Sequence, residues 1–211
     1  MSDGGGGTGP VIGLDFDNTI AAYDDLFLRV ALDRGLVTAG APPGKSQLRD
    51  ALRRQPDGER AWQRLQAEVY GPRLGQARPV AGVHEFLDAC RRRRVAVYVV
   101  SHKTEFAEQD ETRTNLRLAA LAWLRDQGLL ADGTALRREG LFFESTRAAK
   151  VERIRALGCT HFVDDLPEVF LEPGFPEGVE RILLAADGRP APPGVRAARC
   201  WGDVAGAVFG G

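Results

Sequence analysis

Short apolar runs rich in β-branched residues recur along the chain, and segments with helical spacing separate them. The runs are VIGLD at 11–15, VAVYVV at 95–100, LFF at 141–143, HFVD at 161–164, RILLAA at 181–186 and a last strand, AARCW, at 197–201. Alternation of strand and helix patterns is typical of βαβ units and of a mostly parallel sheet. The unbroken hydrophobicity of VAVYVV is typical of a strand that helices cover on both faces. We therefore predict an α/β fold with a parallel sheet flanked by helices.

The segment between the first two strands is much longer than the crossover of about a dozen residues that parallel strands need. It contains LFLRVALDRGL, SQLRDALRRQ and ERAWQRLQAEVY, whose apolar residues recur at three- and four-residue steps. Such spacing predicts amphipathic helices, so we expect a small helical lobe inserted after the first strand. The predicted boundaries are a flexible tail at 1–9, an α/β core at 10–20 and 80–211, the helical lobe at 21–79, and a further helix in the core at about 116–127.

Composition narrows the class of protein. The 211 residues are 44% hydrophobic, enough for one ordinary core, and the 28 basic residues nearly balance the 29 acidic ones. We therefore expect no strong field that would attract nucleic acid or a membrane. Three cysteines without a CxxC pair suggest neither a disulfide framework nor a zinc site. With no signal-peptide pattern and no long apolar run, we expect a soluble, cytoplasmic protein.

Polar residues follow the predicted strands. They are Asp15, Asp17 and Thr19 after the first strand, Ser101, His102 and Lys103 after the second, Asp164 and Asp165 after the fourth, and Lys150 early in the helix that follows LFFES. In a parallel α/β sheet, ligands bind outside the carboxyl ends of the strands. If these strands are neighbours, the carboxylates and lysines converge on one rim.

Several carboxylates cannot share a small volume without a compensating cation. Oxygen ligands without histidine or thiolate pairs suit Mg²⁺, which commonly binds substrate phosphates as well. Such a metal, with Lys150 and Ser101, would neutralise phosphate oxygens and leave one aspartate facing phosphorus. Asp15 and Asp17 fall on one side of the strand exit, because side chains repeat with period two. The pattern therefore indicates phosphoryl transfer, in which one aspartate attacks and the other handles the proton.

The motif DFDNT is similar to the DxDxT signature of the haloacid dehalogenase-like (HAD) hydrolase superfamily. VYVVS, Lys150 and FVDD follow in the order of that superfamily's later motifs, and the resemblance extends from Val11 to Trp201. It implies a Rossmann-like core, and it implies that the inserted lobe is a C1-type cap that closes over the site and selects the substrate.

The resemblance also implies roles. Asp15 would be the nucleophile, and Asp17 would be the general acid and base whose backbone carbonyl binds Mg²⁺. Lys150 would hold the charges of nucleophile and phosphate together, although Lys103 and Arg147 are competitors. Either Asp164 or Asp165 would complete the metal site. The substrate-binding candidates are Ser101, Asn18, Thr19, His102 and Lys103.

We predict a Mg²⁺-dependent phosphatase that acts on a small phosphorylated metabolite through an aspartyl-phosphate. An acid two residues after the nucleophile distinguishes the chain from the dehalogenase branch, which lacks it. Two alternatives stay open, a phosphotransferase or mutase of the same superfamily and a non-catalytic regulatory domain that binds a phosphorylated ligand. Asn18 stands where many phosphatases of the family have glycine, and asparagine tolerates such turns. Trp62, Tyr70 and Trp123 have helical spacing, so we expect them to pack in the core.

Overall fold

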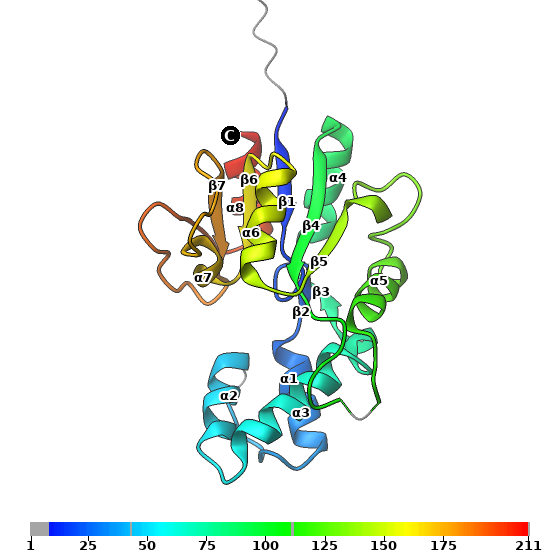
Figure 1. The fold of residues 1–211 in the computed structure, drawn as a ribbon, viewed down its shortest axis with the longest axis vertical. Coiled ribbons are helices and arrows are strands. Elements are labelled where there is room, and N and C mark those ends of the chain that lie inside the picture. Colours follow the sequence, from blue (N-terminus) through cyan, green and yellow to red (C-terminus); the bar gives the residue numbers. More distant parts are fainter. Residues whose placement is uncertain (1–8, 43, 111, 211) are drawn as a thin grey trace, which may run out of the picture.

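A six-stranded sheet forms the centre of the molecule, a computed structural model that describes residues 9–42, 44–110 and 112–210 (Figure 1). The strand order is β5-β4-β1-β6-β7-β8, and every neighbouring pair is parallel. The strands are β1 (Val11–Leu14), β4 (Ala96–His102), β5 (Leu141–Glu144), β6 (His161–Asp164), β7 (Glu180–Leu184) and β8 (Arg196–Ala198). The predicted α/β fold with a parallel sheet is confirmed.

Helices cover both faces of this sheet. One face packs against α4 (Val83–Arg93), α5 (Leu116–Asp126) and α8 (Trp201–Phe209), and the other packs against α6 (Arg147–Ala156) and α7 (Pro167–Phe170). Along β4, Val97 and Val99 join the first cluster while Val100 joins the second, which explains why that strand is apolar throughout. None of the helices in the described part of the chain has the length and hydrophobicity that a bilayer crossing needs.

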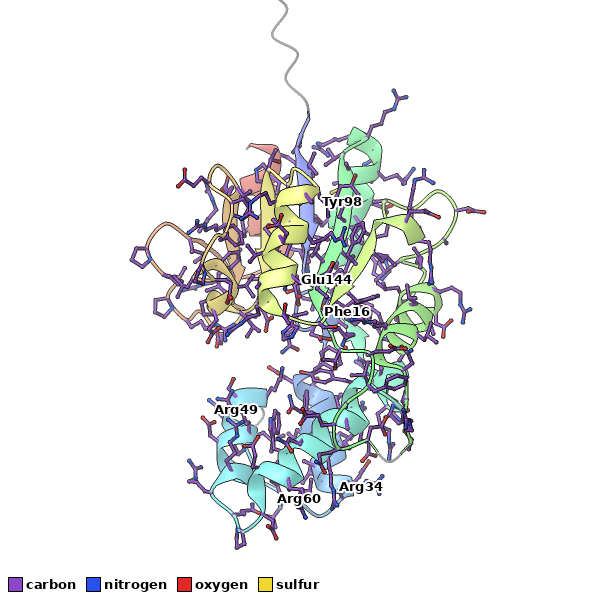
Figure 2. All side chains as sticks on the ribbon, viewed as in Figure 1. Phe16, Arg34, Arg49, Arg60, Tyr98 and Glu144 are labelled. Atoms are coloured by element: carbon purple, nitrogen blue, oxygen red, sulfur yellow. The ribbon has the colours of Figure 1, made fainter. Side chains whose placement is uncertain are left out.

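Three α-helices lie between Ala22 and Arg78 in the described part of the chain, and we call them the helical insert: α1 (Asp24–Asp33), α2 (Lys45–Arg53) and α3 (Gly58–Tyr70). The insert lies beyond the carboxyl ends of β1 and β4, and Arg34, Arg49 and Arg60 mark it in Figure 2 (Figures 1 and 2). It has its own aromatic packing, in which Phe27 stacks on Trp62 with ring centres 5.1 Å apart.

A two-stranded antiparallel ribbon joins the helical insert to the sheet. The chain leaves through β2 (Ala21–Ala22) and returns through the 3-10 turn η1 (Leu74–Gln76) and β3 (Arg78–Pro79). The two connections between the insert and the sheet therefore lie side by side, directly after the loop that carries the paired aspartates.

The carboxyl-terminal prediction is partly wrong. The strand predicted over AARCW ends at Ala198, and Trp201 begins the helix α8, which the sequence pattern did not predict. The Asp203 carboxylate accepts hydrogen bonds from the backbone amides of Arg199 and Cys200, at 2.7 and 3.2 Å, and so caps that helix. The buried residues of α8, Trp201, Val204 and Val208, recur at three- and four-residue steps, so the helical period is present in this short segment although its other residues are mostly glycine and alanine. Residues 1–8 of the predicted flexible tail lie outside the described residues.

Trp123 links three parts of this fold. Its ring packs edge-on against Phe16 with ring centres 5.5 Å apart, and its Nε1 donates a 3.0 Å hydrogen bond to the backbone oxygen of Ala77. The side chain thus ties α5 to the loop after β1 and to the segment before β3.

We expect Trp123→Ala to lower the free energy of unfolding by about 3–5 kcal/mol, because it opens a cavity and leaves the Ala77 carbonyl unpaired. Urea denaturation measures this loss. Leu118→Ala is the matched control, since Leu118 is on the same helix but 59% exposed, and it should change stability by less than about 0.5 kcal/mol. If Trp123→Ala is as stable as the Leu118→Ala control, Trp123 does not link these three parts of the fold.

Candidate active site

A tight loop after β1 presents the first two aspartates. Asn18 adopts a left-handed backbone with φ of 55°, its amide donates to the Ala21 oxygen at 2.8 Å, and its Oδ1 accepts from the Tyr23 amide at 3.0 Å. Asparagine tolerates this conformation because its short polar side chain can hydrogen-bond locally. Asn18, for which we also predict substrate binding, thus stabilises the turn that carries Asp17.

Lys150 lies buried between two aspartates from neighbouring strands. Its Nζ donates to Asp15 Oδ1 at 2.5 Å and to Asp164 Oδ2 at 2.6 Å. The lysine enters on α6, whose first turn is capped by Thr146. Burial opposes the lysine's charge, but the two carboxylates outweigh it and raise the pKa of Lys150 above its usual value.

The two aspartates at the end of β6, Asp164 and Asp165, have different environments. Asp164 uses both oxygens, one on Lys150 and the other on the backbone amide of Leu166 at 2.9 Å. Among the described residues, no hydrogen bond or ion pair reaches the Asp165 carboxylate, while its backbone oxygen accepts from Arg189. Burial, helped by the charges of Asp164 and Asp15, raises the pKa of Asp165 well above its usual range. Asp165 is therefore the carboxylate in this group that lacks a cation.

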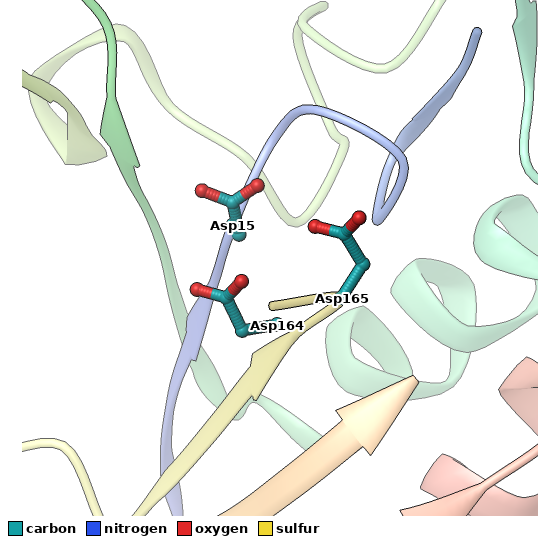
Figure 3. A group of neighbouring side chains, drawn as sticks. All are labelled: Asp15, Asp164 and Asp165. Carbon is teal, nitrogen blue, oxygen red and sulfur yellow. The ribbon is translucent and has the colours of Figure 1, made fainter. Parts of the chain in front are cut away.

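Figure 3 shows Asp15, Asp164 and Asp165 gathered where β1 and β6 end. One oxygen from each lies within 4.8 Å of the others. Two ligand oxygens on opposite sides of one Mg²⁺ are about 4.2 Å apart, so a small adjustment would place all three on one ion. The donors are all carboxylate oxygens, and their like charges favour a divalent cation. The residues present therefore fit a hard metal ion.

Asp17 has a lysine of its own. Lys103, 4% exposed, donates from Nζ to Asp17 Oδ1 at 3.0 Å. The same Nζ lies 4.9 Å from the ring centre of Tyr70 and 5.4 Å from that of Phe16. The two lysines that sequence reasoning left as competitors thus pair with different aspartates, Lys150 with Asp15 and Lys103 with Asp17. The third competitor, Arg147, pairs instead with Glu172 at 3.4 Å.

Besides Tyr23 Oη, two hydroxyls in this region are buried without a hydrogen-bond partner among the described residues. They are Ser101 Oγ at the end of β4 and Thr19 Oγ1 in the loop after β1. Leaving a buried hydroxyl unpaired costs free energy, so such groups often mark a site that a ligand completes. Both residues were predicted to bind substrate, and both are available to do so.

A pocket of about 320 Å³ opens beside Asp17, between α3 and the segment after β4. Most of the residues that line it are polar, and they include Gln63, Gln66, Tyr70, His102, Thr104 and Gln109. His102 lies at the rim with Nε2 3.1 Å from the Ser145 oxygen. The core prediction is right for Trp62 and Trp123, which are buried, and Tyr70 packs against the same core cluster while its half-buried side chain also lines the pocket. Burial, with the charge of Asp17 adding, raises the pKa of Tyr70 to about 12.

Sequence reasoning also missed Arg117. Its Nε donates to the backbone oxygen of Lys103 at 3.0 Å, and its Nη2 donates to Ser145 Oγ at 2.8 Å. Arg117 therefore holds the segment after β4 in the place where Lys103 reaches Asp17. On an amphipathic helix such an arginine looks like any solvent-exposed charge, so the sequence offered no signal for it.

No family model matches this sequence, and no curated protein matches it significantly. Solved structures do match it in fold. HAD-hydrolase YfnB from Bacillus subtilis bound to magnesium has a TM-score of 0.58 and 14% identity, with 95% of this chain and 98% of that chain covered. A HAD family hydrolase from Deinococcus radiodurans R1 with bound phosphate and sodium has a TM-score of 0.57 and 15% identity, with 94% of each chain covered.

A protein described as a dehalogenase also matches, with a TM-score of 0.56 and 12% identity over 95% of this chain and 97% of that chain. Identities this low establish the architecture and leave the reaction to the site residues. The chain has the fold of the HAD-superfamily hydrolases.

Proposed function

We propose that this chain is a Mg²⁺-dependent phosphatase of the cytoplasm that hydrolyses a small phosphorylated metabolite. One observation carries the proposal. Asp15 and Asp17, which lie on one tight loop beside the unpaired Asp165, each form an ion pair with a different lysine, Asp15 with Lys150 and Asp17 with Lys103. The fold supports a hydrolase, and the magnesium and phosphate bound by two of its structural neighbours suit a cluster of this composition.

In the proposed reaction, an oxygen of Asp15 attacks the phosphorus of the substrate and forms an aspartyl-phosphate. The bond between phosphorus and the ester oxygen breaks, and that oxygen takes a proton from Asp17. Asp17 then takes a proton from a water molecule whose oxygen attacks phosphorus, so that Asp15 is released with inorganic phosphate. Lys150 orients Asp15, and Ser101 and Thr19 donate to phosphoryl oxygens. Asp15 and Asp165 would hold Mg²⁺, which would neutralise charge on the phosphoryl oxygens when bound.

Asp17 favours a phosphate ester over a carbon–halogen bond. A halide leaves as a stable anion and needs no proton, whereas an alkoxide leaving group needs an acid at the departing oxygen. The Asp17 side chain is 21% exposed and lines the pocket of about 320 Å³, so both the leaving group and water can reach it. The dehalogenase among the structural neighbours therefore does not change the proposed reaction.

We expect Asp15→Asn to lower phosphate release by about a thousandfold or more, because an amide is a poor nucleophile. The assay is Mg²⁺-dependent phosphate release over a panel of phosphorylated metabolites. Asp126→Asn, an exposed aspartate on α5, is the matched control and should keep wild-type turnover. Full turnover by Asp15→Asn would exclude the aspartyl-phosphate.

Mg²⁺ should raise the melting temperature of the wild-type chain, and Asp165→Asn should remove most of that effect. A ligand present at a hundred times its Kd stabilises the folded state by about 2.7 kcal/mol, which thermal denaturation detects. Asp132→Asn, an exposed aspartate, should respond to Mg²⁺ like the wild type. If Asp165→Asn responds equally, the metal does not bind where we place it.

Lys150→Met should cost more stability than Lys103→Met in metal-free buffer. The first leaves Asp15 and Asp164 buried without a cation, which typically costs about 3–5 kcal/mol. The second leaves Asp17, whose side chain is partly exposed, so we expect a loss of about 1 kcal/mol. Urea unfolding of the two variants compares them directly, and equal losses would contradict the roles proposed for the two lysines.

A further inference from the structure

The chain contains three lysines, and two of them are already in the site. Lys103 and Lys150 pair with its aspartates, the third is Lys45, and every other basic residue of the 28 is arginine. Arginine and lysine are not interchangeable, because lysine offers a compact point charge where arginine offers a planar fork. Lys45 is therefore an exception on a helical insert whose other cations are arginines.

Lys45 begins α2, and its side chain lies against the aromatic residues between the insert and the sheet. Its Nζ is 5.3 Å from the ring centre of Tyr70 and 5.6 Å from that of Phe27. Tyr70 is the same ring that Lys103 approaches from the side of the sheet. The start of α2 is held in place, because the Lys45 amide donates to Asp24 Oδ1 at 3.3 Å. Lys45 thus reaches the site from the insert, across one shared ring.

No carboxylate forms an ion pair with Lys45 Nζ among the described residues, in contrast to Lys103 and Lys150. Burial opposes its charge, but Tyr70, Asp165 and Asp17 outweigh burial and raise the pKa of Lys45 above its usual value. The Lys45 ammonium is therefore favoured by the carboxylates of the site but forms no ion pair with any of them among the described residues.

The balance of charge in the site favours an anion as the partner of Lys45. Lys103 and Lys150 offset two of the four aspartates, and a divalent ion would offset the other two. A phosphate dianion entering this balanced site would meet one positive charge not yet matched, the ammonium of Lys45. Desolvated anions bind where such charge is held in place.

The geometry points to Lys45 as a phosphate-binding residue supplied by the helical insert, whose ammonium donates to phosphoryl oxygens that the sheet side of the site already holds. This inference rests on the proposed function. It also gives phosphate a way to draw the insert onto the sheet, since Lys45 belongs to the insert, the aspartates follow strands of the sheet, and the ribbon formed by β2 and β3 joins the two parts.

Isothermal titration of inorganic phosphate into the full chain with saturating Mg²⁺ tests this inference. Lys45→Met keeps an apolar side chain of similar length on the two rings but removes the charge, and it should raise the Kd for phosphate about tenfold or more. Lys45→Arg keeps the charge but replaces the compact ammonium with a planar guanidinium, so it should raise the Kd by less than Lys45→Met does. Arg49→Gln removes a cation from the same helix that pairs with Asp50, and it should leave the Kd unchanged.

An unchanged Kd in Lys45→Met overturns the inference, as does an equal loss in Lys45→Arg or Arg49→Gln, or a wild type that binds no phosphate. Measuring the turnover of phosphate esters by the wild type shows whether a failed test concerns Lys45 or the proposed phosphatase function. A wild type that hydrolyses phosphate esters, with an unchanged Kd in Lys45→Met, rejects the role of Lys45 and leaves the phosphatase standing. Weaker phosphate binding in Lys45→Met, with no turnover in the wild type, supports Lys45 and rejects the phosphatase.

Discussion

The buried Lys150 between Asp15 and Asp164 is the interaction on which the rest of the site depends. Burying one ammonium or one carboxylate alone is unfavourable, because each loses its hydration. Here the three groups are tolerated together, because the Lys150 ammonium offsets the charge of both carboxylates. This requirement fixes α6 against the ends of β1 and β6. It also occupies both oxygens of Asp164, so Asp165 is left as the carboxylate that needs a cation from outside the chain.

Charge in the site is divided among elements that are far apart in sequence. Asp15, the candidate nucleophile, forms an ion pair with Lys150 on α6, while Asp17 forms one with Lys103 after β4. Arg117 on α5 hydrogen-bonds to the backbone oxygen of Lys103 and so holds that lysine in place. Two neighbouring carboxylates can therefore take different roles without repelling each other. The helical insert faces this arrangement across Tyr70, and the ribbon of β2 and β3 is its only covalent path to the sheet.

Much of this organisation is legible in the sequence. Unbroken apolar runs predict buried parallel strands, and in such a sheet the residues after each strand share one edge, so Asp15, Ser101 and Asp164 were found from their positions. Residues outside that pattern were not found. Tyr70 and Lys45 lie on amphipathic helices whose periodic apolar residues are explained by packing alone, so nothing marked these two as site residues. Arg117 resembles a surface charge in the sequence.

The sequence by itself determined the α/β class, the parallel strands, the inserted helices and the set of polar groups at the strand ends. Those features depend on local periodicity, which each segment carries alone. The tertiary structure decided which lysine meets which aspartate, which member of the Asp164 and Asp165 pair stays free, and which face of α3 opens onto the pocket. These are contacts between segments up to 135 residues apart, and their geometry is set by packing and by the need to neutralise buried charge.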